Sequence, residues 1–153
     1  MEPQDRNASF FRFEDLRVYA KAIDYATWLV SSLREPGSEA ERTLMVQFNR
    51  SAYNIAIIIA EGSSRNKMHF QQYLKNAKSA IRECVVFTEV SFKMDMMSQE
   101  HYNRSRDSLM ELTRMVGALI ISLQRGAARR DDESDDMIGE NDEETYGNIN
   151  LGF

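Results

Sequence analysis

Four basic residues recur at helical spacing in the middle of the chain: Lys75, Lys78, Arg82 and Lys93. If this segment is a helix, a rotation of about 100° per residue places all four within about 60° of one another. Such a stripe of Lys and Arg can bind nucleic acid by displacing the counterions of the phosphate backbone. These residues are therefore candidates for an RNA-binding surface. Glu89 lies in the same stripe and Glu83 follows Arg82, so an ordinary solvated helix face is the alternative interpretation.

Residues that could do other chemistry are few. The chain has two His and one Cys, which is too few for a zinc site rich in these ligands. His69 and His101 are far apart in the sequence and form no Glu-x-x-His pair. Cys84 falls on an apolar helix face, so we expect a buried structural thiol. Phosphate-loop, nucleophile-elbow and metalloprotease motifs do not occur in the sequence. We predict no enzyme, no catalytic residue, no metal, no cofactor and no small-molecule substrate.

The charge of the chain is divided unevenly. The 153 residues include 19 Lys and Arg and 24 Asp and Glu, for a net charge of −5. All 19 basic residues lie at or before Arg130, together with 15 of the acidic ones, and the remaining 9 acidic residues follow without a base. The sequence therefore combines a mildly basic body with an acidic tail, and that tail could compete with RNA for the basic stripe.

The elements that must position the basic stripe are helices. Apolar residues recur at three- and four-residue steps, the period of an amphipathic helix. Breaks at Pro36-Gly37, at Gly62-Ser63-Ser64 and near Ser98 divide the pattern into helices over about 14–34, 39–61, 66–97 and 99–124. Ser38 with Glu41 predicts a capping box at the second helix start. Gly126 is the predicted stop of the last helix.

These four helices predict the fold class. Amphipathic helices with short connections, and no alternating strand pattern, favour an all-α, antiparallel up-down-up-down four-helix bundle over residues 13–126. Residues 1–12 are predicted to be a flexible lead. Residues 127–153 lose the helical period and gather acidic residues, so we predict a disordered acidic tail.

Each helix has one main apolar stripe that predicts the core. In the first helix the stripe comprises Leu16, Tyr19, Ala20, Ile23, Ala26, Val30 and Leu33. In the second it comprises Leu44, Phe48, Ala52, Ile55, Ala56 and Ile59. In the third it comprises Phe70, Tyr73, Leu74, Ala77, Ile81, Cys84 and Val85. In the fourth it comprises Tyr102, Leu109, Leu112, Val116, Leu119, Ile120 and Leu123.

The second and third helices also have apolar residues away from these stripes. The residues that lie off the predicted core face are Ile57, Ile58, Val86, Val90, Met94 and Met97. One helix face cannot bury both sets inside a single bundle. Contiguous apolar surface of this kind marks contacts between proteins, so we predict that identical copies pack side by side through these residues. The pattern leaves the number of copies open.

Three segments carry a family resemblance. Residues 13–22, with the sequence FEDLRVYAKA, resemble the opening F-x-D-L-x-V-[WY]-x-K-A of the small four-helix-bundle proteins encoded by intervening sequences in bacterial 23S ribosomal RNA genes, also called S23 ribosomal proteins. Ala60, Glu61, Gly62 and Arg65 are similar to the family turn A-E-G-x-x-R. Residues 70–83 resemble its third helix, and the similarity covers about residues 13–125.

The resemblance implies a cyclic homo-oligomer, typically of five bundles, with no catalytic activity and with roles connected to RNA. It also implies a relation to the accessory variability protein of diversity-generating retroelements, a basic pentamer that binds RNA and a reverse transcriptase. Two residues depart from the family pattern, since Ala56 and Ile58 stand where a proline and an asparagine are usual. Glu61 is expected to form a structural salt bridge with Arg65 or Arg50, with a role in binding as the alternative.

The leading functional prediction is a non-enzymatic, oligomeric scaffold or adaptor that binds RNA or an RNA-handling protein such as a reverse transcriptase. The alternative is a protein-only interaction module whose acidic tail engages a basic partner. The chain opens without the apolar segment of a signal peptide, and it has no stretch of about 18 uncharged apolar residues for a membrane span. We therefore expect a cytoplasmic protein without membrane contact.

Overall fold

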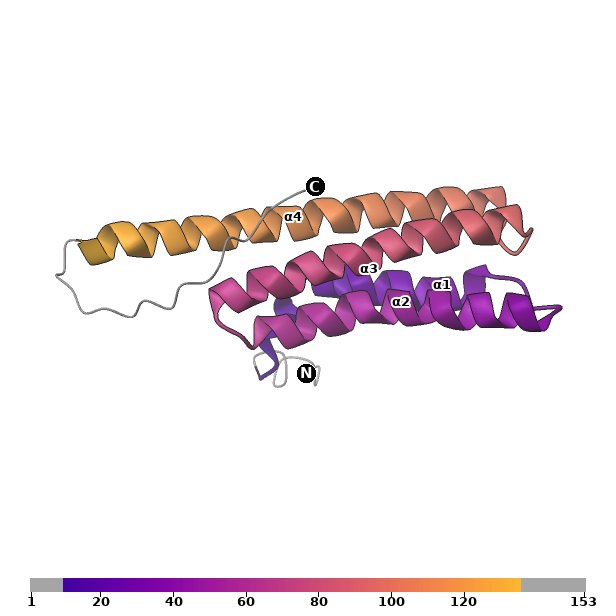
Figure 1. Cartoon of the computed structure of the whole chain (residues 1–153), viewed down its shortest axis with the longest axis horizontal. Helices are drawn as coiled ribbons and strands as arrows, with labels where there is room; N and C mark the ends of the chain where they lie inside the picture. Colours follow the sequence, from indigo (N-terminus) through magenta and orange to yellow (C-terminus); the bar gives the residue numbers. More distant parts are fainter. Residues whose placement is uncertain (1–9, 136–153) are drawn as a thin grey trace, which may run out of the picture.

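The fold is all-α, as the sequence predicts. The computed structural model describes residues 10–135, and side chains over residues 10–126. A short 3-10 helix η2 (Arg12–Asp15) precedes four α-helices: α1 (Arg17–Ser32), α2 (Glu39–Ser63), α3 (Lys67–Lys93) and α4 (Gln99–Asp135). No strand occurs within residues 10–135. The helices lie side by side along one long axis (Figure 1).

The last helix is longer than predicted. Gly126 does not stop α4, which continues to Asp135 and projects past the start of α3 (Figure 1). Gly126 does not adopt the left-handed backbone of a helix stop. A glycine inside a helix costs only about 1 kcal/mol relative to alanine, and the Ala-Ala-Arg-Arg run that follows favours continuation. The predictions for residues 1–9 and 136–153 lie outside the described residues.

The core confirms the stripes predicted for α2, α3 and α4. All six stripe residues of α2 are buried, and the stripe residues of α3 and α4 are buried or packed against the core, except the half-buried Tyr73. The structure contains fully buried large side chains on every α-helix, including Leu29, Phe48, Leu74 and Leu112. Within residues 10–135, no helix has the length and apolar character needed to cross a membrane.

The stripe predicted for α1 is confirmed in part. Ala26 and Leu33 are buried, and Leu16 and Tyr19 pack against the core, but Ile23 and Val30 are exposed. The core face is rotated by about a quarter turn and also holds Val18, Ala22, Tyr25 and Leu29. The difference follows from Tyr25, whose hydroxyl needs a partner when it is buried. The Tyr25 hydroxyl lies 2.8 Å from Ser105 Oγ. Burial raises the pKa of Tyr25 well above its ordinary value, so the phenol stays protonated.

A chain of buried hydroxyls connects three helices. Ser105 Oγ on α4 lies 2.7 Å from Thr88 Oγ1 on α3, and Thr88 donates to the carbonyl of Cys84 at 2.7 Å. With the Tyr25 contact, this network satisfies all three hydroxyls inside the core, which avoids the penalty of an unpaired buried polar group. The network therefore fixes α1 and α3 against α4.

The start of α2 is held by a capping site and an ion pair. Ser38 accepts a hydrogen bond from the Glu41 amide at 3.2 Å, which confirms half of the predicted capping box. The Glu41 carboxylate does not close the box. It accepts two hydrogen bonds from Arg34, both at 2.8 Å, and one from the Gly37 amide at 2.7 Å. The ion pair therefore closes the α1–α2 loop.

This ion pair predicts a specific loss of stability in acid. The hydrogen bonds from Arg34, and then from Gly37, lower the pKa of Glu41 to about 2. The stabilisation is therefore complete above the ordinary carboxyl pKa of about 4.5 and is lost as pH falls through about 2. We expect Glu41→Gln to lower the urea midpoint at pH 6. The difference in urea midpoint between this variant and wild type should shrink steadily below about pH 4.5. A difference of constant size down to pH 2 would contradict the assigned role of the ion pair.

Helices α2 and α3 approach closely near Gly62. A Cβ on Gly62 would lie 2.5 Å from Tyr73 Cβ and 3.0 Å from Phe70 Cδ2. Along the same pair, Phe48 stacks on Phe87 with ring centroids 5.6 Å apart. The predicted break is confirmed, because α2 ends at Ser63, but Gly62 lies inside the last turn of α2 rather than just past its end. Its role is therefore close helix packing.

Candidate nucleic-acid interface

Three of the four predicted cations lie together on α3. The pKa of Lys78 is lowered, chiefly by burial and also by the nearby charges of Arg82 and Lys75. The Lys78 side chain crosses to α4, where its Nζ lies 3.7 Å from the point that a Cβ on Gly117 would occupy. Lys75 Nζ is buried without a hydrogen-bond partner. These three residues, named here the α3 basic cluster, form one concentration of positive charge.

Lys93 stands apart from the α3 basic cluster. It ends α3, about 16 Å along the helix from Arg82 at 1.5 Å per residue. Between them, Glu89 accepts a hydrogen bond from the Tyr102 hydroxyl at 2.7 Å, which raises the pKa of Tyr102. The predicted stripe of four is therefore a cluster of three plus one distant residue.

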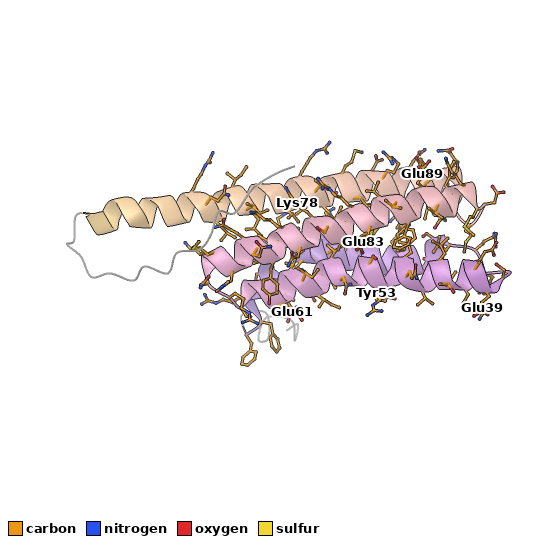
Figure 2. All side chains as sticks on the ribbon, viewed as in Figure 1. Glu39, Tyr53, Glu61, Lys78, Glu83 and Glu89 are labelled. Carbon is orange, nitrogen blue, oxygen red and sulfur yellow. The ribbon has the colours of Figure 1, made fainter. Side chains whose placement is uncertain are left out.

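The carboxylates near this cluster face other partners. Glu83 accepts a hydrogen bond from Ser51 of α2 at 2.8 Å. Figure 2 shows Lys78 on the α4 side of α3 and Glu83 on the α2 side. The ion pairs between described side chains, Lys21–Glu111 and Arg34–Glu41, involve neither Lys75 nor Arg82. Lys75 and Arg82 thus form no ion pair with a described carboxylate.

Sequence reasoning missed Lys67, one of two further cations near this cluster. A groove of about 590 Å³ between the start of α3 and α4 is lined by Lys67, Ala118, Ile121, Ser122, Arg125 and Gly126. The Lys67 side chain reaches α4 at Gly126, and its Nζ lies 2.9 Å from the Cβ position there. The glycines within α4 were the available signal, because an interior glycine often marks a close approach. For Arg125, the sequence favours an interaction with the end of the helix dipole, with a phosphate contact as the alternative.

Three predicted interface residues are exposed and three are not. Ile57, Val86 and Val90 are exposed on α2 and α3. Ile58 and Met94 are half-buried against the core, and Met97 is only 4% exposed. These assignments fail for two reasons. Helix α3 ends at Lys93, so the helical phase does not extend to Met94 and Met97, and Ile58 lies closer to the core face of α2 than the pattern suggested.

Two more apolar residues extend the exposed face. Val46 and Tyr53 are exposed on α2, in line with Ile57. At about 100° per residue the three fall within about 40° of one another, and Val86 and Val90 do so on α3. The outer apolar face, as we name it, therefore comprises Val46, Tyr53, Ile57, Val86 and Val90. It lies on the two helices that pack at Gly62.

The turn that resembles the family motif, from Ala60 to Arg65, does not contain the predicted ion pair. Glu61 is exposed and forms no ion pair with a described side chain. Arg65 instead lies over the Tyr73 ring, 5.8 Å from its centroid, and Arg50 is exposed on α2. The predicted salt bridge of Glu61 is therefore wrong, and Arg65 contacts the aromatic face of Tyr73 instead. Ala60 is half-buried beside Glu61.

The other residues that could react or bind a metal serve packing. Cys84 is completely buried, and burial raises the pKa of its thiol to about 12, so it remains protonated at neutral pH. His101 contacts the Ser32 carbonyl through Nδ1 at 3.0 Å and lies edge-on to Trp28. Among the described side chains, no three His, Cys, Asp or Glu residues gather as a metal site. Ala56, at the usual proline position, is buried within a continuous α2.

Comparison with known proteins identifies one relationship. A family model described as 23S rRNA-intervening sequence protein matches residues 14–118. The match covers more than half of the chain and extends from η2 into α4. No curated protein matches the chain.

Proposed function

The chain belongs to the 23S rRNA-intervening sequence protein family, and from this premise we propose that it is a non-enzymatic scaffold that assembles with itself and binds RNA. In this proposal, antiparallel four-helix bundles pack side by side into a ring through the outer apolar face. The α3 basic cluster then supplies each copy with an RNA-binding surface, and the ring repeats that surface around its axis.

The outer apolar face supports self-assembly. Ile57 is 49% exposed and Val86 is 60% exposed in the single chain. Burying apolar surface yields about 25 cal/mol per Å², so covering several such side chains favours association. In a ring, each interface joins one patch of a copy to a different patch of the next copy. In this proposal the α2 part of the outer apolar face on one copy packs against the α3 part on its neighbour.

The observation that carries the RNA assignment is the grouping of Lys75, Lys78 and Arg82. Burial and the nearby charges of Arg82 and Lys75 lower the pKa of Lys78, and an anion bound beside the cluster would offset the repulsion among these charges. Lys75 already has a buried ammonium without a hydrogen-bond partner. A phosphate backbone provides repeated negative charge and releases its counterions on binding. Repetition of the cluster around a ring would further strengthen binding through multivalency.

Neutralising two residues of the cluster tests the RNA assignment. We expect Lys78→Gln combined with Arg82→Gln to weaken binding to structured RNA by about tenfold or more at about 50 mM salt. The slope of log K against log salt should become shallower by about 1.5, because two phosphate contacts are lost. Filter binding over a salt series measures both quantities.

The control variant has the same change of net charge, introduced outside the α3 basic cluster. Arg17 and Arg104 are exposed on α1 and α4, and Arg17→Gln with Arg104→Gln should leave RNA affinity within about twofold of wild type. A full chain that fails to bind at about 50 mM salt, and still fails when it ends at Arg130, would reject the RNA assignment. In that case, binding of a basic protein lost with the same truncation would favour the protein-only module.

A further inference from the structure

The groove between the start of α3 and α4 has the composition of an anion site. Its charged lining residues are Lys67 and Arg125, and Ser122 adds a hydroxyl about one turn from Arg125. No carboxylate lines it. Its floor includes Ala118 and the exposed Ile121. Two cations around one concave space repel each other, and an anion bound between them would offset that repulsion.

The two sides of the groove are fixed by helix geometry. Lys67 is the first residue of α3, and the Asn66 side chain accepts the His69 amide at 2.9 Å to cap that helix. The first turn of a helix has unpaired amides and a partial positive charge. Opposite it, Gly126 leaves room for the Lys67 side chain, whose Nζ lies 2.9 Å from its Cβ position. The Lys67 ammonium can lie at the groove because Gly126 has no side chain at that position.

We infer that this groove binds a phosphate group through Lys67, Arg125 and Ser122. The inference rests on the proposed function for the identity of the carrier, which is RNA. The groove begins at Ala118, directly after the Lys78 crossing at Gly117, and reaches Gly126, about 14 Å from Gly117 at 1.5 Å per residue. It therefore extends the RNA-binding surface from the α3 basic cluster to the start of α3. Arg125 offers planar, paired donors that suit phosphate oxygens.

Inorganic phosphate is the probe for the site itself. Thermal unfolding of the full chain is measured in phosphate and in chloride at equal ionic strength and protein concentration. A ligand that binds only the folded state raises Tm. Phosphate also stabilises proteins generally by exclusion from their surfaces, but that contribution is shared by all variants. We expect the wild-type rise to exceed that of Lys67→Gln with Arg125→Gln by about 2–4 °C.

Two controls separate the groove from its surroundings. The Arg17→Gln, Arg104→Gln chain has the same net charge as the groove variant and should keep the full phosphate-dependent rise. Gly126→Ala changes no charge, but its Cβ would displace the Lys67 ammonium and should reduce the rise. Gly117→Ala, with its Cβ 3.7 Å from Lys78 Nζ, should keep it. An equal rise in wild type and in the groove variant would overturn the inference, because phosphate would then act by general exclusion only.

RNA binding distinguishes this inference from the proposed function. Loss of RNA affinity in the Lys67→Gln, Arg125→Gln chain, together with the Tm result, supports RNA phosphate as the occupant. A phosphate-dependent Tm rise with unchanged RNA affinity would overturn RNA as the carrier and assign the groove to a free phosphate compound. If the wild-type chain binds no RNA but keeps the rise, the proposed function fails and the phosphate site stands.

Discussion

Replacing Ile57 and Val86 together by aspartate is expected to convert the assembled protein into single chains of 17.7 kDa. Both side chains are exposed in the single chain, so the change should leave the fold intact. In the assembly each would place a carboxylate in an apolar contact, which costs several kcal/mol when no partner compensates the charge. A cost of about 3 kcal/mol per interface already raises Kd more than a hundredfold. Sedimentation velocity at micromolar concentration measures the change.

The control for this experiment is Val30→Asp on α1. Val30 is 54% exposed, between the values for Ile57 and Val86, but it lies outside the outer apolar face. We expect this variant to keep the mass of the wild-type assembly. Circular dichroism of all variants checks that the helices remain. An Ile57→Asp, Val86→Asp chain with the wild-type mass, or a Val30→Asp chain that dissociates equally, would show that the assembly uses another surface.

Gly62→Ala is expected to be strongly destabilising although alanine is the better helix former. The substitution would gain about 1 kcal/mol from helix propensity. The new Cβ would, however, lie 2.5 Å from Tyr73 Cβ, an atom that no side-chain rotation can move. Relief therefore requires α3 to shift away from α2, and overpacking of this kind costs 1–3 kcal/mol or more. We expect a net loss of about 2 kcal/mol, or a fall in Tm of about 5 °C.

Gly117→Ala is the matched control for Gly62→Ala. It is also a helical glycine at an α3 contact, but its Cβ would lie 3.7 Å from the flexible end of Lys78, which is an ordinary contact. This variant should be as stable as wild type or more stable by up to about 1 kcal/mol. Urea unfolding at one fixed protein concentration compares the two. Equal effects of the two substitutions would contradict the assigned role of Gly62.

The sequence predicted most of the fold because local periodicity determines most of it. Helices α3 and α4 begin where expected and bury most of their predicted stripes, because their main apolar residues recur at the helical period. The stripe predicted for the first helix is only partly correct. The observed core face includes Tyr25, and its partner Ser105 lies 80 residues away. Such a partner across the bundle cannot be read from one helix.

The candidate site was less predictable because it depends on how helices cross. The Lys75, Lys78 and Arg82 grouping follows from one helix and was predicted. Lys67 and Arg125 line the same groove because residues 118–126 of α4 lie alongside the start of α3. The direction of Glu83 toward Ser51 likewise depends on the neighbouring helix. The sequence therefore predicted the cluster of cations on α3 but not the groove that Lys67 and Arg125 form across two helices.

The outer apolar face lies apart from the Lys78 side chain and from the α3–α4 groove. Val86 and Val90 are exposed on α3, whereas Lys78 crosses toward Gly117 of α4. Assembly through α2 and α3 would therefore leave the α3–α4 groove open. Arg82, however, lies one turn before Val86 and about 40° from it, so this cation borders the outer apolar face.

The mass of the full chain in solution is the most direct test of this account. Light scattering coupled to size exclusion, at micromolar concentration and near-physiological salt, reports the mass without reference to shape. We predict one species whose mass is a whole-number multiple of 17.7 kDa. A single 17.7 kDa species that persists as the protein is concentrated would contradict self-assembly, and with it the scaffold that we propose.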